Sequence, residues 1–103
     1  MEVDKYNLKM RTNDDFMLTV NVGYSIAEAT PKLIVVSNPK LVDWSSFISV
    51  VNATTGEFII HVKASGIEEL GAGQYLYECI MDFGGGSKAF LFGGSLKVSK
   101  GLV

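Results

Sequence analysis

Apolar and polar residues alternate with a period of two along residues 74–83. Tyr75, Tyr77 and the following odd positions are apolar or aromatic, whereas acidic residues occur among the even positions. This alternation predicts a strand whose odd face points into a core. Residues 84–87 can supply the positive φ angles of a chain reversal, and a second strand is expected over 88–98. The sequence therefore predicts a β-hairpin as the centre of the fold.

The same alternation recurs in short segments along the rest of the chain, with polar turn residues between them. The predicted strands cover residues 6–11, 16–22, 31–36, 47–51, 58–62, 74–83 and 88–98. Seven short strands with turn signals at near-regular spacing are typical of a sandwich of two sheets. We therefore expect an all-β, antiparallel, immunoglobulin-like β-sandwich of about seven strands, folded as a single domain over residues 1–103.

One short helical turn is expected just before the hairpin. Ser65 and Glu68 have the spacing of a capping box, and Gly71 ends the turn soon afterwards. The sequence Leu-x-x-Gly-x-Tyr follows and ends at Tyr75. This spacing resembles the tyrosine corner of immunoglobulin-like sandwiches, in which a hydroxyl at the start of a strand bonds the preceding backbone. A core aromatic is the simpler interpretation of Tyr75.

The inward faces of these strands predict the core. Its expected members are Phe16, Leu18, Val20, Phe58, Ile60, Val62, Tyr75, Tyr77, Cys79, Leu96 and Val98. On the returning strand of the hairpin, one face is expected to carry Phe90, Phe92, Leu96 and Val98. Gly93 and Gly94 interrupt that strand, which predicts a bulge or a close approach of the backbone there.

The composition is rich in apolar residues and poor in charge, at 48% hydrophobic and 19% charged. Apolar side chains left over on strand faces usually form an interface. The candidates opposite the predicted core are Met17, Ile59, Leu76, Ile80 and Leu91. Trp44, in the loop 38–46, is a candidate anchor for a partner, with burial in the core as the alternative. We expect a homo-oligomer, most simply a dimer or trimer, or a part of a larger assembly.

Charge and cysteine content narrow the classes of partner. Nine basic and eleven acidic residues are scattered and give a net charge of −2, so no basic stripe predicts binding to nucleic acid. Cys79 is the single cysteine, which rules out a disulfide within the chain. The N-terminal residues lack the pattern of a signal peptide, and the apolar runs are too short to span a membrane. We expect a soluble protein.

Candidate catalytic and metal-binding residues are sparse. His61 is the single histidine, and Cys79 occupies a core-facing position. We therefore interpret His61 as a surface imidazole and Cys79 as a packed thiol, because a nucleophile would need a base within hydrogen-bond reach. Asp14 and Asp15 could contribute to a calcium site, but a solvated polar turn is the plainer interpretation. Residues 84–88 lack the order of a phosphate loop, because the lysine follows the serine. We expect no enzymatic activity, no cofactor and no metal.

Five short segments occur in an order that resembles one group of proteins. They are 13–16 between the first two strands, 55–58 opening another strand, 65–68, 73–78 and 94–98. Together they resemble the small β-sandwich structural proteins of tailed bacteriophage virions. These comprise capsid decoration (cement) proteins and the accessory β-domains of tails and baseplates.

The resemblance implies a structural protein without catalysis, assembled in the cytoplasm of a bacterial host and carried in the virion. Its partners would be copies of itself and the major capsid protein or another virion protein. A capsid decoration protein is the first expectation, and a tail or baseplate accessory protein is the second. A cellular immunoglobulin-like or fibronectin-like module that binds a protein or a sugar is the competing class. A small ligand-binding barrel would need a set of polar side chains that the sequence does not offer.

Overall fold

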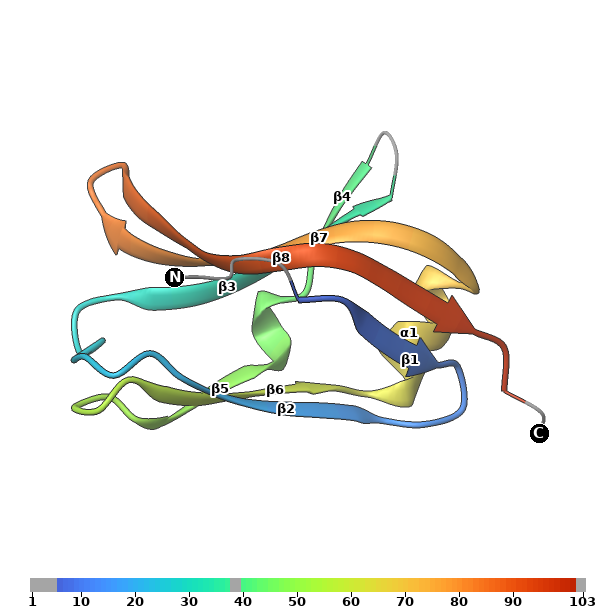
Figure 1. Cartoon of the computed structure of the whole chain (residues 1–103), viewed down its shortest axis with the longest axis horizontal. Helices are drawn as coiled ribbons and strands as arrows, with labels where there is room; N and C mark the ends of the chain where they lie inside the picture. The colour runs from blue at the N-terminus through green and yellow to red at the C-terminus, as the bar shows by residue number, and fades with distance from the viewer. Residues whose placement is uncertain (1–5, 38–39, 102–103) are drawn as a thin grey trace.

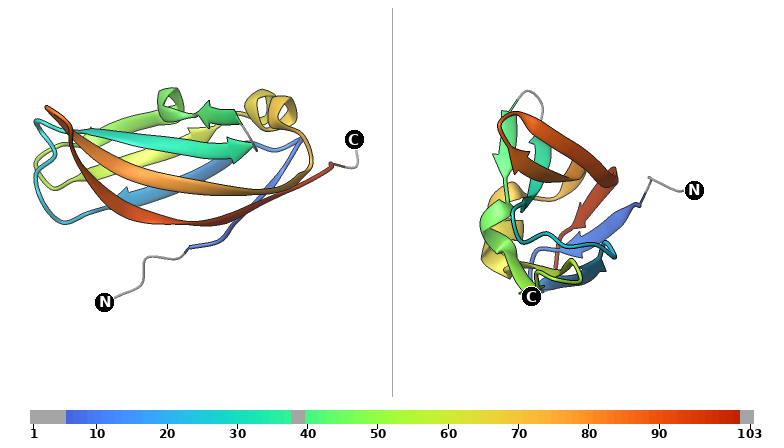
Figure 2. Two further views of the ribbon diagram at one scale, coloured as in Figure 1. Left: turned by 90° about the horizontal axis from the view of Figure 1, so that it is seen from above. Right: turned by 90° about the vertical axis from the view of Figure 1, so that its left-hand side faces the viewer.

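Two β-sheets lie face to face in the computed structural model, which describes residues 6–37 and 40–101 (Figure 1). In chain order the elements are β1 (Leu8–Arg11), β2 (Phe16–Asn21), β3 (Thr30–Ser37), β4 (Lys40–Asp43), the 3-10 helix η1 (Ser45–Phe47), β5 (Ile48–Asn52), β6 (Glu57–Val62), α1 (Ala64–Leu70), β7 (Gly73–Gly84) and β8 (Ser87–Ser99). The first sheet has the strand order β1-β8-β7-β3-β4 and the second has the order β2-β6-β5. The views in Figure 2 show the two layers, with η1 passing from one to the other. The predicted immunoglobulin-like β-sandwich is confirmed.

Strand β4 was not expected from the sequence. It lies within the predicted loop 38–46 and pairs with β3, where Val42 is opposite Val35 and Leu41 is opposite Val36. Four residues are too few for an alternating pattern to stand out from a loop. Asn38 and Pro39, which belong to the same predicted loop, lie outside the described residues.

The pairing of β1 also departs from the expected antiparallel arrangement. β1 runs parallel to β8, with Leu8 opposite Leu96 and Met10 opposite Val98. β1 and β2 therefore do not form a hairpin, although only a short turn joins them, because each belongs to a different sheet. Leu8 and Met10 are buried, so β1 closes one side of the core before the chain passes to the second sheet.

The side chains between the sheets form one hydrophobic core. Its largest fully buried members are Tyr77, Phe58, Leu33, Ile60, Ile67, Met81, Leu96, Val35, Val62 and Cys79. The predicted inward faces of β6 and β7 are thus confirmed, except at the end of β7, where Phe83 is 42% exposed. Phe16, Leu18, Val20 and Tyr75 are partly buried and pack against this core. The inward residues of β2 are less covered than those of β6 because β2 lies at the edge of its sheet.

One face assignment on β8 was wrong. Cys79 pairs with Phe92 while the next residue, Ile80, pairs with Phe90, so Leu91 is an extra residue that forms a bulge. Upstream of this bulge the faces are exchanged, and Phe90 points outward instead of inward. Gly93 provides the close approach that was expected: a Cβ there would lie 2.7 Å from the carbonyl oxygen of Tyr77.

The helix before β7 begins differently from the prediction. Lys63 is the N-cap residue of α1, its own side chain makes no capping hydrogen bond, and Ser65 lies inside the first turn, so the capping box is wrong. The backbone N–H of Ala64 donates instead to Oδ1 of Asp15 at 2.8 Å, from a turn far away in the sequence. A local motif could not reveal this partner.

The tyrosine corner is confirmed. The hydroxyl of Tyr75 lies 2.9 Å from the carbonyl oxygens of both Leu70 and Gly71, the last residue of α1 and the residue after it. This contact ties the end of α1 to the start of β7. It therefore fixes the point where the chain crosses from the second sheet into the first.

Candidate interaction face

The outer surface of the five-stranded sheet carries several exposed apolar side chains. On β7, Tyr77, Cys79 and Met81 point into the core, so Leu76 and Ile80 point outward. The register then defines which outward side chains are neighbours on adjacent strands. This surface is called the apolar face below, and its members are Ile34, Val36, Leu41, Leu76, Ile80 and Phe90.

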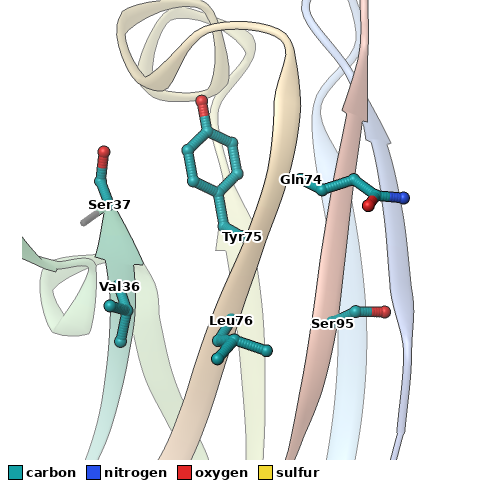
Figure 3. A pocket seen from close by; sticks show the side chains of 6 residues that line it. All are labelled: Val36, Ser37, Gln74, Tyr75, Leu76 and Ser95. Atoms are coloured by element: carbon teal, nitrogen blue, oxygen red, sulfur yellow. The ribbon is translucent and has the colours of Figure 1, made fainter.

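One row of the apolar face crosses β4, β3 and β7. Leu41 is opposite Val36, which in turn is opposite Leu76. Leu41 is 69% exposed and Leu76 is 63% exposed, which is unusual for neighbouring leucines on a sheet. Val36 and Leu76 also line a shallow hollow of about 530 Å³ that reaches Tyr75 (Figure 3).

A second part of the apolar face lies on β7 and β8. Ile80 is opposite Phe90, which is 49% exposed. The Phe90 ring extends along β8 over Gly93, since a Cβ at Gly93 would come within 3.2 Å of a ring carbon. A hollow of about 230 Å³ joins Phe90 to Leu76 and Val36, with Glu78 in its lining, so the two parts of the face adjoin each other.

Charged groups border the apolar face. Nζ of Lys32 lies 3.2 Å from Oδ2 of Asp82. Hydrogen bonds from the Gly84 backbone N–H and from Lys32 lower the pKa of Asp82 below its ordinary value. Glu78 projects from β7 between Leu76 and Ile80, and it is exposed. Glu78 is directly opposite Ile34, so one carboxylate also stands inside the apolar face, between its two parts.

The predicted interface residues do not form one patch. Leu76 and Ile80 lie together on the apolar face, but Met17 and Ile59 belong to the second sheet. Met17 is 60% exposed there, on the far side of the molecule from Leu76. Leu91 is the bulge residue of β8, and it packs partly against the core near β2. Strand alternation gave the direction of the Met17, Leu76 and Ile80 side chains but not the sheet to which each belongs.

Trp44 is not available as a surface anchor, because it is only 5% exposed. Its ring packs edge to face with that of Phe47, with ring centroids 6.0 Å apart. The sequence pattern did not identify four members of the apolar face, namely Ile34, Val36, Leu41 and Phe90. Leu41 was missed because β4 was not predicted, and Phe90 was missed because the bulge exchanges the faces of β8.

The residues considered for catalysis or metal binding are engaged elsewhere. Oδ2 of Asp15 lies 2.9 Å from Nε2 of His61, while Oδ1 of Asp15 accepts from Ala64. Cys79 is buried, and burial raises the pKa of its thiol to about 12. Among the described residues, no three His, Cys, Asp or Glu side chains group as metal ligands. Neither described helix is long and apolar enough to cross a bilayer.

The contact between Asp15 and His61 predicts an acid-dependent stability. The hydrogen bonds with His61 and then Ala64 lower the pKa of Asp15 below its ordinary 3.8, so the folded state favours the carboxylate. The stabilisation is complete above the unfolded pKa and is lost as pH falls through the folded pKa. We expect Asp15→Asn to melt at a lower temperature than the wild type at pH 6, with the two melting temperatures converging as pH falls through the lowered pKa of Asp15.

Thermal melts between pH 2 and about 7, followed by circular dichroism, measure this difference. His61→Gln is the matched control, because it removes the first partner of Asp15 while keeping a polar side chain. When His61→Gln is also present, the change in melting temperature caused by Asp15→Asn should be smaller than it is in the wild type at every pH. A gap that stays constant across the acid range would show that Asp15 does not titrate with the fold.

Comparisons with known proteins add little about function. The sequence matches no protein-family model and no curated protein. Among solved structures, the chain is similar to a structure of murine CRIg, with a TM-score of 0.44 and 9% sequence identity. The alignment covers 96% of this chain and 93% of the CRIg chain. A likeness this distant carries no function across.

Proposed function

We propose that this chain is a non-enzymatic structural protein that attaches to a larger protein assembly through its apolar face. One observation carries the proposal: Leu41, Leu76 and Phe90 are each about half exposed or more, on one continuous sheet surface. Large contiguous apolar surfaces are rare on monomeric proteins and mark sites of interaction. Covering this face with a partner removes that surface from water.

The shape of the apolar face favours a protein as its partner. Its two hollows lie on the outer surface of a sheet, and Val36 and Leu76 belong to the lining of both. A site for a small molecule usually encloses most of its ligand and presents a few converging polar groups. A broad sheet surface with Leu76 near its middle is better suited to the flat surface of another folded domain.

The setting we propose is the virion of a tailed bacteriophage, with the chain acting as a capsid decoration protein that stabilises the shell. The order of sequence segments described above supports this setting, and a tail or baseplate position is the alternative within it. A cellular immunoglobulin-like binding module is the second candidate function. The hydrogen bonds of Tyr75 to Leu70 and Gly71 favour it, since the tyrosine corner recurs in such modules.

Leu76→Lys tests the proposal directly. The lysine places a charge at the centre of the contact, so we expect the affinity for the partner particle to fall at least about tenfold, which corresponds to about 1.4 kcal/mol. Leu76 is 63% exposed, so the free energy of unfolding should change by less than about 0.5 kcal/mol. Cosedimentation with assembled capsid shells and with purified tails of a tailed phage measures the binding.

The matched control is Val51→Lys, at a residue that is 54% exposed on β5 of the other sheet. It should bind like the wild type. Equal losses for Leu76→Lys and Val51→Lys would contradict a role of the apolar face. Failure of the wild type to bind shells or tails would instead favour the cellular binding module.

A further inference from the structure

The four edge strands of the described sheets differ in how well they are protected against pairing with another chain. β1 and β4 are four residues long, and each carries two charged residues. β5 is irregular, because its register shifts between Val50 and Asn52. Short length, charge and bulges are the usual means of blocking edge-to-edge pairing. β2 has none of them: it is six residues long, regular along its whole pairing with β6, and free of charge and proline.

At the free edge of β2, the backbone N–H and C=O groups of every second residue are unpaired. The N–H of Val22 donates to the carbonyl oxygen of Gly56, in register with the pairing of β2 and β6. Ladder bonds in an antiparallel pair involve every second residue, so the even residues of β2 bond to β6. The N–H and C=O groups of Met17, Thr19 and Asn21 therefore point away from β6. Among the described residues, no strand lies on that side of β2.

This edge opens onto an apolar groove between β2 and β8. The groove has a volume of about 440 Å³, and Leu18 and Val20 line one side of it. Leu91 and Phe92 of β8 line the other side, and the side chain of Tyr6 lies against Phe92 with ring centroids 6.0 Å apart. No charged side chain lines the groove. The opening thus combines a free strand edge with an apolar interior.

We propose that β2 pairs antiparallel with β2 of a second copy of this chain, around a two-fold axis through Thr19. The free backbone phase requires odd residues to face odd residues, and the register centred on Thr19 is the one that pairs all three of Met17, Thr19 and Asn21. Thr19 is then opposite Thr19 of the partner subunit, and Met17 is opposite Asn21 of the partner subunit. Leu18 lies beside Val20 of the partner subunit, on the inward side of the sheet. The two three-stranded sheets become one continuous sheet of six strands.

The composition of β2 suits a second copy as the occupant. No charged residue occurs in the sequence between Asp15 and Glu28, so an antiparallel copy brings no like charges together. Leu18 and Val20 of the partner subunit point to the same side as the groove, and they cover the apolar side chains there. A six-residue strand pair is smaller than a standard interface, so we expect a Kd of roughly 1–100 µM.

The inference does not depend on the proposed function, because β2 and the apolar face belong to different sheets. Its test is a charge exchange at Thr19. Thr19→Lys places two ammonium groups opposite each other on the axis, and Thr19→Glu places two carboxylates there. Each variant alone should be monomeric at concentrations where the wild type is dimeric. An equimolar mixture of the two should form dimers again, as measured by sedimentation equilibrium.

Ser49→Lys is the matched control. Ser49 lies on β5, opposite Ile59, just as Thr19 lies opposite Ile59 from the other side. The control therefore adds the same charge on the same sheet surface, but at the other edge, and it should remain dimeric. Hydrogen exchange gives a second readout: protection of the Met17, Thr19 and Asn21 amides should rise with protein concentration.

Three results would overturn the inference. The first is a wild type that stays monomeric up to about 1 mM, well above the expected Kd. The second is a dimer that survives both Thr19 variants but dissociates in Leu76→Lys, which would assign the dimer to the apolar face. The third is a monomer in which the Thr19 and Asn21 amides are protected at every concentration. That result would mean that another segment of the same chain covers the edge.

Discussion

Tyr77→Ala is expected to lower the free energy of unfolding by about 3–5 kcal/mol, the usual cost of emptying a large aromatic site. Tyr77 is 1% exposed, at the centre of β7 and of the core. Its ring packs edge to face with Phe92, with ring centroids 6.1 Å apart. Its hydroxyl donates to the carbonyl oxygen of Tyr6, so the same side chain also holds the segment that leads into β1.

Urea denaturation measures this loss as a shift of the midpoint at constant slope. Tyr77→Phe separates the two contributions, because it keeps the ring and removes only the hydroxyl. We expect it to cost about 1 kcal/mol, the net value of one hydrogen bond. A loss below about 1 kcal/mol for Tyr77→Ala would contradict the position of Tyr77 in the core.

Gly56→Ala is expected to be the second most damaging change, at about 2–5 kcal/mol. Gly56 has a φ of +81°, and the left-handed region costs other residues about 1–2 kcal/mol. A Cβ at this position would also meet the carbonyl oxygen of Tyr24, and Cγ2 of Val22 at 2.5 Å. Overpacking against such groups adds about 1–3 kcal/mol. Gly56 is therefore essential to the turn that joins β5 and β6.

Gly23 supplies a matched control for Gly56. Its φ of +79° is nearly the same, but a Cβ there would meet nothing within 4 Å. Gly23→Ala should therefore cost only the conformational term of about 1–2 kcal/mol. Urea denaturation of the two variants side by side separates backbone conformation from steric contact. Equal losses would show that the contacts of Gly56 relax without cost.

Much of the fold follows from local alternation, because burial of one strand face leaves a period of two in the sequence. β6 and β7 are the clearest cases, with Phe58 and Tyr77 pointing inward as expected. Local patterns predicted the wrong strand face where one extra residue shifts the alternation of inward and outward side chains. The extra residue Leu91 exchanges the faces of β8, so the outward position of Phe90 is visible only once β8 is paired with β7.

Only part of the candidate site, Leu76 and Ile80, could be predicted from the sequence, for a related reason. Alternation correctly directs Leu76 and Ile80 outward, and it directs Met17 outward as well. Whether two outward side chains share a surface depends on pairings between strands far apart in the chain. Leu76 meets Val36 through the pairing of β7 with β3, whereas Met17 lies on the other sheet. Such pairings are set by the whole core and leave no local signal.

The parallel pairing of β1 with β8 has a consequence for synthesis of the chain. The backbone N–H of Ser95 donates to Oδ1 of Asn7, 88 positions away. At roughly 5–20 residues per second, the segment that leads into β1 waits about 4–18 s on the ribosome for its partner strand. Leu8 and Met10 have no strand to pack against during that interval. The five-stranded sheet is thus completed only once β8, its last strand in chain order, has been made.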